Sequence, residues 1–294
     1  MKSLIVIICN PVAHSLSADK VRRASDYIRR QGYDVELLFT ERAGHGRELA
    51  RSVLDKKPFR IIAAGGDGTI NEVLNGMVCS SVPLAILPLG TTNVLAKELN
   101  IPTDINNAMR TALSGTVRNI SLGRIELPDE PSKHQRFFCL MAGIGFDAHA
   151  VYTVKPGIKK ISGEGAYILS GISNLFRYHP SKLFFTVDGE EHSGHAAIIG
   201  KASRYGGNFK VTPDAVLEDP SLYICIFKGG NRSHVLRYAW GIVRGNHLLY
   251  KDVIYAKALH ISVLGKAHIQ IDGDYLGTTP ADITVEKDAL MVAY

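Results

Sequence analysis

The 294-residue chain has 34 Lys and Arg residues against 28 Asp and Glu residues, a formal net charge of +6 at pH 7. Its 46% hydrophobic and 21% charged content excludes a disordered or low-complexity chain, and its length allows two domains. The positive charge suits anionic partners such as nucleotides or an acidic membrane surface. No basic run interleaved with aromatic residues occurs, so we expect no nucleic-acid partner.

The four cysteines, at positions 9, 79, 139 and 225, are far apart, and no Cys-x-x-Cys pair occurs. This spacing argues against a zinc or redox motif and predicts reduced thiols in a cytoplasmic protein. No segment approaches the ~18 consecutive apolar residues of a membrane span. We therefore expect any membrane contact to be peripheral and transient.

Strand and helix signals alternate over residues 1–121, which predicts a parallel sheet covered by helices. The apolar runs predict strands at 4–9, 35–39, 59–64 and 84–87. Helices are expected at 17–31 and 46–54 and after Asp67. Ser17 is the expected cap of the first helix, and Gly32 is its expected stop.

Residues 122–294 contain mostly short β-type runs, so the expected fold is an α/β domain followed by a β-rich domain. Strands are predicted at 136–142, 183–187, 196–199, 222–227, 259–264, 268–271 and 281–285, and helices at 166–176 and 234–245. Two Asp-Gly pairs, at 188–189 and 272–273, are typical of hairpin turns. A ligand cleft between the two domains is the default expectation.

A glycine-rich loop follows the apolar run 61–64 and reads Gly65-Gly66-Asp67-Gly68-Thr69. Glycines let backbone N–H groups surround an anion, and the helix that follows adds partial positive charge. Asp67 beside phosphates makes sense if a metal ion lies between them. The loop therefore favours a Mg-nucleotide site, against the alternative of a tight turn in which Asp67 caps the helix.

Two further loops with small hydrogen-bonding residues follow apolar strands, at 10–14 and at 90–93. Thr40, at the end of the run 35–39, is a weaker candidate. Because the carboxyl ends of parallel strands meet at one edge, we expect these loops to converge on one phosphate site.

Other motifs are absent or ambiguous. No P-loop or Gly-x-Ser-x-Gly elbow occurs, and Gly143–Ala148 imitates a dinucleotide fingerprint in β-rich surroundings. We interpret that segment as a backbone turn at the domain junction. Asp274 is either a solvated hairpin residue or a carboxylate placed to take a proton from an alcohol, and Asp219 is either a turn residue or a cation ligand.

These motifs resemble the diacylglycerol kinase catalytic family, the bacterial soluble lipid kinases related to sphingosine kinases. The resemblance covers nearly the whole chain and is most specific over Gly65–Gly76 and Pro88–Asn93. Gly143–Ala148 resembles the opening of the family's second domain, and Asp272–Asp274 its closing motif. The implied fold is an N-terminal α/β nucleotide-binding domain, as in NAD kinases, followed by a β-sandwich.

The resemblance also implies roles for individual residues. Asp67 would be tied to the magnesium of ATP, and Asp274 would stand at the position of the catalytic base. Asp219, with carbonyl groups near Val216 and Ser221, would hold a structural cation, and Lys159 would join the acidic network. The residues implied to hold ATP are Asn10, Thr40, Gly65, Gly66, Asp67, Gly68, Thr69, Asn71, Glu72, Gly90, Thr91 and Asn93.

Three positions depart from the family pattern. Asp274 stands where the usual residue is glutamate, and Val94 and Ser121 stand where the family has aspartates. The acidic network around magnesium is therefore thinner than in the family's best-studied branch.

The leading hypothesis is an ATP- and Mg²⁺-dependent lipid kinase of phospholipid biosynthesis, acting most simply on diacylglycerol to form phosphatidate. Its partners would be ATP and a lipid at a membrane surface, with a homodimer as a further possibility. A basic face for the membrane is expected from Lys155, Lys159, Lys160, Arg177, Arg204, Arg232 and Arg237. Two alternatives stay open: a NAD kinase-like phosphotransferase and a non-catalytic lipid- or nucleotide-binding regulator.

Overall fold

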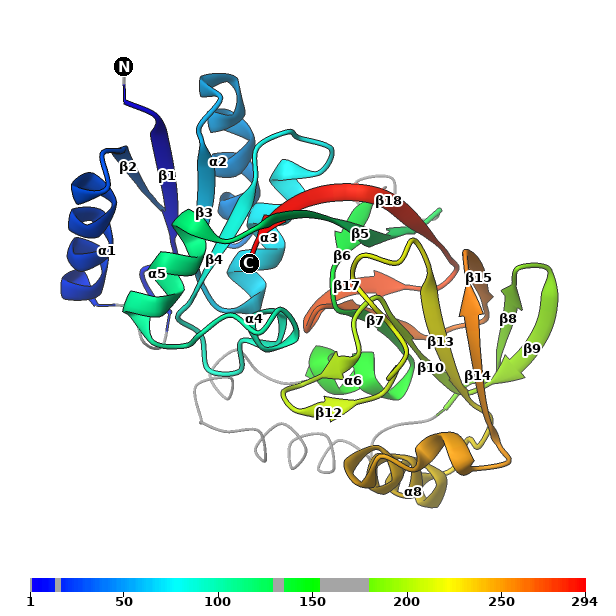
Figure 1. Ribbon diagram of the computed structural model, residues 1–294. Helices are drawn as coiled ribbons and strands as arrows, with labels where there is room; N and C mark the ends of the chain where they lie inside the picture. Colours follow the sequence, from blue (N-terminus) through cyan, green and yellow to red (C-terminus); the bar gives the residue numbers. More distant parts are fainter. Residues whose placement is uncertain (1, 14–16, 129–134, 154–179) are drawn as a thin grey trace. The chain divides into compact units, whose positions relative to one another are not determined.

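The computed structural model describes residues 2–13, 17–128, 135–153 and 180–294 (Figure 1). The chain divides into two compact units, one formed by Met1–Ile120 with Lys287–Tyr294 and the other by Ser121–Glu286. The chain leaves the first unit within strand β5 (Val117–Glu126) and returns to it within β18 (Ala281–Ala293). This differs from the predicted second domain of residues 122–294, because the last eight residues pack with the first unit.

The first unit is built on four parallel strands in the order β2-β1-β3-β4. Near its end, β18 adds a parallel pairing in which Val292 lies opposite Leu84. The strands are β1 (Leu4–Cys9), β2 (Asp34–Phe39), β3 (Arg60–Gly65) and β4 (Leu84–Pro88). All four predicted strands are therefore confirmed.

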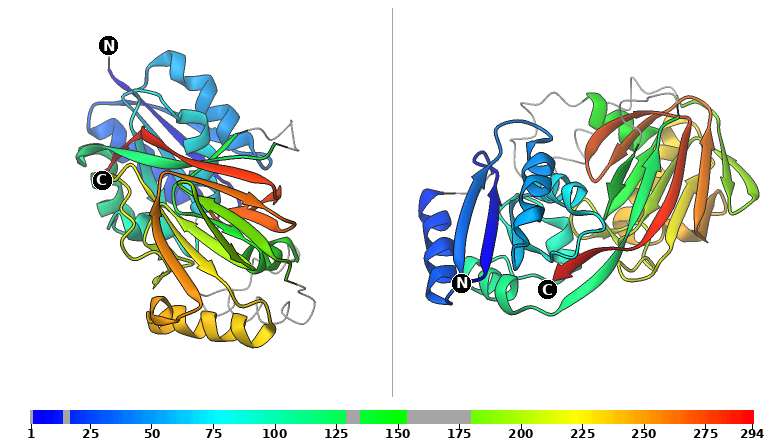
Figure 2. Two further views of the ribbon diagram at one scale, coloured as in Figure 1. Left: turned by 90° about the vertical axis from the view of Figure 1, so that its right-hand side faces the viewer. Right: turned by 90° about the horizontal axis from the view of Figure 1, so that it is seen from above.

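Helices cover both faces of this sheet (Figure 2). The side chains of α1 and α5 pack on one face of the sheet with Ile5, Ile7 and Ile62, and α2 lies against α3. The helices are α1 (Ala18–Arg30), α2 (His45–Val53), α3 (Asp67–Met77), α4 (Val94–Glu98) and α5 (Ile105–Ser114), and a 3₁₀ turn spans Leu54–Lys56. The Ser17 hydroxyl accepts the Lys20 N–H at 3.2 Å, which confirms the predicted cap of α1.

The second unit contains two layers of mostly antiparallel strands. One sheet has the order β14-β13-β10-β7-β16-β17, and the other brings β18, β15, β8 and β9 together with β5 and β6. Side chains from both layers form one core, for example Phe185, Ile224, Ile269 and Ile283. The predicted α/β fold followed by a β-rich fold is confirmed.

The remaining elements of the second unit are short. The strands are β6 (Arg136–Phe138), β7 (Met141–Ile144), β8 (Leu183–Val187), β9 (Glu190–Gly194), β10 (Ala196–Gly200), β11 (Arg204–Tyr205), β12 (Phe209–Lys210), β13 (Leu222–Phe227), β14 (Val253–Ala258), β15 (His260–Leu264), β16 (His268–Ile271) and β17 (Asp274–Thr278). The helices are α6 (Phe146–Thr153) and α8 (Arg232–Arg244), with a 3₁₀ turn at His247–Leu249. The predicted helix 166–176 lies outside the described residues.

Both Asp-Gly pairs form hairpin turns, as predicted. Asp188 and Gly189 join β8 to β9 with φ of 47° and 93°, and Asp272 and Gly273 join β16 to β17 with φ of 47° and 88°. Two consecutive positive φ angles match the right-handed twist of the paired strands, and aspartate followed by glycine tolerates them.

Three predicted boundaries in the second unit differ clearly from the structure. The strand expected at 281–285 is β18, which continues to Ala293. The expected strand 136–142 is broken into β6 and β7, because the Asp272 carboxylate binds the backbone between them. The segment 143–148, interpreted as a turn only, bends at Gly145 with φ of 92° and then begins α6 at Phe146.

Candidate active site

Three loops converge at the carboxyl edge of the first unit's parallel sheet. The loop after β1 reaches the loop after β3, since the Asn10 side-chain amide donates to the Thr69 hydroxyl at 3.2 Å. The Asn10 backbone N–H also donates to the carbonyl of Ala64 at 3.1 Å. The structure thus brings together the first two of the predicted phosphate-binding loops.

The loops after β3 and β4 touch through their glycines. A Cβ atom built on Gly90 would lie 2.4 Å from the Gly66 Cα, which no real side chain tolerates. The Leu89 N–H donates to the Gly65 carbonyl at 2.9 Å and fixes the same contact. Position 90 therefore needs glycine for this backbone-to-backbone approach, whereas a Cβ on Gly66 would lie 3.2 Å from the Gly90 Cα, a tight contact.

The N-terminus of α3 opens at this edge. The helix begins at Asp67, and Gly66 before it supplies no side-chain cap for the backbone N–H groups of the first turn. An eleven-residue helix with an uncapped N-terminus attracts anions through these N–H groups and its dipole. This is the arrangement expected of a phosphate-binding loop.

Asp67 is half-buried at the start of α3. Burial raises the pKa of this carboxyl, and hydrogen bonds from the backbone of Val94 and Leu95 partly oppose the rise. The Leu95 N–H donates to Asp67 Oδ1 at 3.1 Å, so Asp67 binds the start of α4. Burial makes the charged carboxylate unfavourable, and a bound divalent cation would offset this cost. The residue therefore fits a magnesium ligand.

Other predicted ATP residues shape the loops. The Glu72 carboxylate accepts the N–H groups of Gly44 at 2.7 Å and Gly46 at 2.9 Å, and so holds the start of α2. The Asn71 side chain is buried and accepts from the Asn75 amide at 3.1 Å within α3. These contacts lie along α3 and away from its first turn.

The last loop of the set is closed by its own asparagine. Asn93 has φ of 49°, accepts the Gly90 N–H and donates to the Gly90 carbonyl, both at 2.9 Å. Thr91 at the loop's tip is exposed, whereas Thr40 is buried and its N–H donates to the Cys9 carbonyl. His14, also expected in this set of loops, lies outside the described residues.

In the second unit, the Asp272–Asp274 turn carries two carboxylates in different positions. Asp272 accepts the N–H groups of Cys139, Leu140 and Met141, each at 2.9 Å, and so anchors the segment between β6 and β7. Asp274 opens β17 and is half-buried. The Asp272 carboxylate therefore fixes this turn to the segment 139–141.

Asp147 is a half-buried carboxylate to which the motifs assigned no role. It accepts hydrogen bonds from the Tyr205 hydroxyl and, at 2.6 Å, from the Gln270 amide. Burial raises its pKa, and these two donors partly oppose the rise. Gln270 also accepts the Gly273 N–H at 2.8 Å, so this network supports the turn that carries Asp274. The signal available in the sequence was an aspartate two residues after Gly145.

Two of the three predicted ligands of a structural cation, Val216 and Asp219, contact lysine ammonium groups. The Lys201 side chain is fully buried, and its Nζ donates to the Val216 carbonyl at 2.6 Å. The Asp219 carboxylate pairs with Lys257 Nζ at 2.9 Å, and the Ser221 N–H donates to the Asp219 carbonyl at 2.8 Å. Burial lowers the pKa of Lys201 to about 8, and the nearby Asp219 and Glu218 oppose the fall.

These groups therefore do not fit a structural metal cation. The Val216 carbonyl already accepts from the Lys201 ammonium group, and the Asp219 carboxylate is already paired with Lys257. Within residues 2–13, 17–128, 135–153 and 180–294, no group of three or more His, Cys, Asp or Glu side chains is placed to hold a metal. Lys159, expected to join the acidic network, lies outside the described residues.

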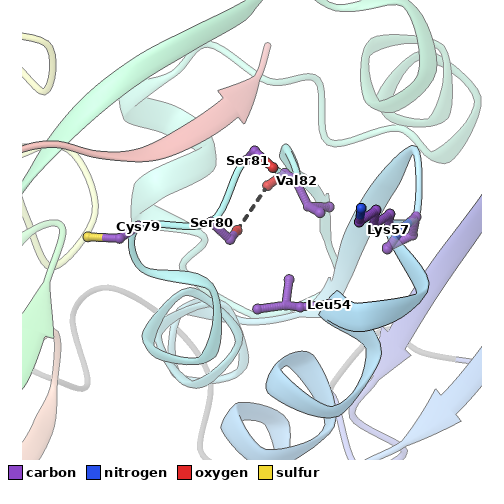
Figure 3. A pocket seen from close by; sticks show the side chains of 7 residues that line it. Leu54, Lys57, Cys79, Ser80, Ser81 and Val82 are labelled. Carbon is purple, nitrogen blue, oxygen red and sulfur yellow. Dashed lines mark hydrogen bonds between the residues drawn. The ribbon is translucent and has the colours of Figure 1, made fainter.

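A surface depression lies at the opposite edge of the first unit's sheet (Figure 3). Its lining residues precede β3 and β4, at 54, 57, 58 and 79–82, whereas the glycine loops follow these strands. It contains Cys79, the exposed one of the four free cysteines. The depression is therefore separate from the phosphate-binding edge.

Comparisons with known proteins agree with this geometry. The family model described as the diacylglycerol kinase catalytic domain matches residues 4–125. The model described as the YegS C-terminal NAD kinase beta sandwich-like domain matches residues 141–294. The fold and the glycine-loop site thus define a kinase with an NAD kinase-like architecture of α/β domain and β-sandwich.

Relatives named as diacylglycerol kinases match over most of their length. One from Bacillus subtilis (strain 168) is 30% identical over 284 residues, covering 94% of this chain and 91% of the relative. One from Staphylococcus aureus (strain bovine RF122 / ET3-1) is 30% identical over 261 residues, covering 87% and 80%. The chain belongs to the diacylglycerol kinase family.

Solved structures share the fold. A crystal structure of a diacylglycerol kinase from Bacillus anthracis str. Sterne has a TM-score of 0.70 at 19% identity, covering 100% of this chain and 97% of that one. Yeast NADH kinase complexed with NADH has a TM-score of 0.57 at 10% identity, covering 99% and 83%.

Among the described residues, no helix is both long and apolar enough to cross a bilayer.

Proposed function

We propose that this protein is an ATP- and Mg²⁺-dependent lipid kinase that phosphorylates diacylglycerol to phosphatidate. The observation that carries the proposal is the contact of Gly66 with Gly90 at the uncapped N-terminus of α3, beside the half-buried Asp67. Membership of the diacylglycerol kinase family supports the choice of acceptor.

The first unit would bind the nucleotide. Backbone N–H groups at the start of α3 would face the phosphates of ATP, and the dipole of α3 would favour their negative charge. Asp67 would hold magnesium, which neutralises charge on the transferring phosphoryl group when bound. Glu72, Asn71 and Asn93 would act indirectly, by fixing the loops that carry these N–H groups.

The second unit would supply the proton acceptor. In the proposed step, the lipid hydroxyl oxygen bonds to the γ-phosphorus, the bond from that phosphorus to the β–γ bridging oxygen breaks, and ADP leaves. The hydroxyl proton passes to the Asp274 carboxylate, which opens β17. Asp272 and Gln270 would position Asp274 by holding the turn on which it lies.

The likeness to yeast NADH kinase motivates a second candidate acceptor, the nucleoside hydroxyl of NAD. The third reading, a regulator that binds lipid or nucleotide without turnover, rests on Val94 and Ser121, which stand where the family pattern has carboxylates. The same experiment separates the three.

The test follows label from γ-phosphate-labelled ATP to diacylglycerol, phosphatidylglycerol, ceramide and a sphingoid base in mixed micelles, with NAD as a soluble acceptor. Asp67→Asn and Asp274→Asn are assayed beside Asp55→Asn, an exposed aspartate at the other edge of the first unit. We expect labelled phosphatidate that both site variants lose and the control retains. Labelled NAD, or bound ATP with no labelled product, would refute the lipid kinase.

A further inference from the structure

Helix α8 presents an exposed apolar stripe. Leu236, Trp240 and Val243 are 46%, 56% and 42% exposed, and their spacing of four and three residues places them on one side of the helix. Leu249, just beyond the helix, is 82% exposed. The opposite side is buried: a Cβ on Gly241 would lie 2.7 Å from the Tyr250 ring.

The helix is held firmly at both ends and in its middle. The Asn231 side chain accepts the His234 N–H at 2.9 Å, and Gly245 ends the helix with φ of 70°. The Tyr238 hydroxyl donates to Asp252 at 2.5 Å and accepts the Gly229 N–H at 2.8 Å. These contacts fix the orientation of the helix, so the fold itself keeps the apolar stripe exposed.

Positive charge surrounds the stripe. The segment 228–251 contains five Lys and Arg residues and no Asp or Glu, within a chain whose net charge is +6. Arg232, Arg237 and Arg244 on α8 are exposed, and the Arg244 guanidinium lies 4.7 Å from the centre of the Trp240 ring. Arg237 is paired with Asp252, the first acidic residue after the segment.

We propose that α8 is the surface by which this protein docks on an anionic lipid bilayer. Tryptophan prefers the level of the lipid headgroups, aliphatic side chains on one helix face enter the acyl boundary, and arginines attract acidic headgroups. The inference rests on the proposed function, since a kinase with a lipid acceptor must reach the bilayer that holds it.

Charge decides between a bilayer and a second copy of this chain. In a symmetric dimer through α8, the cations of one copy would face the same cations of the other, and like charges repel. An anionic bilayer offers complementary charge across the whole patch. Other cations predicted for a membrane face, Lys155, Lys159, Lys160 and Arg177, lie outside the described residues, and Arg204 lies on β11.

The protein contains a single tryptophan, Trp240, which makes its fluorescence a direct reporter of α8. We expect a blue shift with vesicles of phosphatidylcholine and phosphatidylglycerol, and none with phosphatidylcholine alone. Added salt should reverse it, because exposed charges are screened. No shift with the anionic vesicles would overturn the proposal.

Variants locate the contact by vesicle co-sedimentation. Arg232→Gln and Arg244→Gln should each weaken binding about fivefold, and Leu236→Ala should weaken it on the order of tenfold. The matched controls are Arg30→Gln on α1 and Leu264→Ala, an exposed leucine on β15. Equal losses in the controls would overturn the assignment of the contact to α8.

Two further measurements keep the alternatives apart. Analytical ultracentrifugation without lipid would reveal a dimer that Leu236→Ala dissociates, and that result would assign α8 to a second copy instead. Vesicle binding by Asp67→Asn should equal that of the wild type. Turnover of a short-chain diacylglycerol in detergent without vesicle binding would refute docking alone, and vesicle binding without lipid turnover would refute the kinase alone.

Discussion

Asp272→Ala is expected to destabilise the second unit strongly, because one carboxylate satisfies three backbone N–H groups. Each charge-assisted bond contributes about 1.5–3 kcal/mol, and water reaching the half-buried site recovers part of that loss. We therefore expect a loss of about 3–5 kcal/mol. For a unit of this size, the melting temperature should fall by roughly 10 °C.

Asp188→Ala is the matched control, because Asp188 also has φ of 47° before a glycine and carries the same backbone strain. Its carboxylate accepts from the backbone of Leu259 and His260, but it is exposed, so we expect a loss of about 1 kcal/mol.

Asp272→Asn keeps one acceptor oxygen and tolerates a positive φ, and it should fall between the wild type and the alanine variant. The melting temperature of each variant is measured by differential scanning calorimetry. Equal melting temperatures for Asp272→Ala and Asp188→Ala would refute the reasoning.

Three further predictions concern single residues. Asp67→Asn should abolish turnover while leaving the apoprotein's melting temperature unchanged or raised, because burial makes the charged form unfavourable; a lower melting temperature would indicate a structural role instead. Gly90→Ala should raise the KM for ATP on the order of tenfold, since its Cβ displaces Gly66, and an unchanged KM would contradict the loop contact. Burial lowers the pKa of His247, whose Nε2 lies 2.9 Å from the Val211 carbonyl, so the unfolded chain binds the proton more readily. The free energy of unfolding should therefore fall as the pH drops below 6.5, and less steeply in His247→Gln, as urea titrations at several pH values would show.

Most of the correct predictions of secondary structure came from short sequence patterns. The apolar runs identified the four parallel strands, Ser17 identified the start of α1, and the two Asp-Gly pairs identified their hairpins. The glycine loops were recognised at consecutive strand ends. Each of these signals depends on residues within a few positions of one another, which is why one sequence suffices to read them.

Functional roles within the site were harder to predict. The motif around Asp67 pointed to a nucleotide-binding loop, but Glu72 in the same motif holds the backbone at 44 and 46, and Asp272 in the closing motif anchors 139–141. Val216 and Asp219 were expected near a cation, and Lys201 and Lys257 are their partners. In each case the deciding partner lies at least fifteen residues away in the chain.

The sequence by itself determined the order of the elements, the hairpin turns and the glycine loops, because backbone preferences and hydrophobic periodicity act over short stretches. Tertiary structure alone decided that β18 returns residues 287–294 to the first unit and that Gly66 meets Gly90. It also decided that the apolar stripe of α8 is left exposed. Contacts between distant segments depend on how the whole chain packs, and no local pattern encodes which partner each side chain meets.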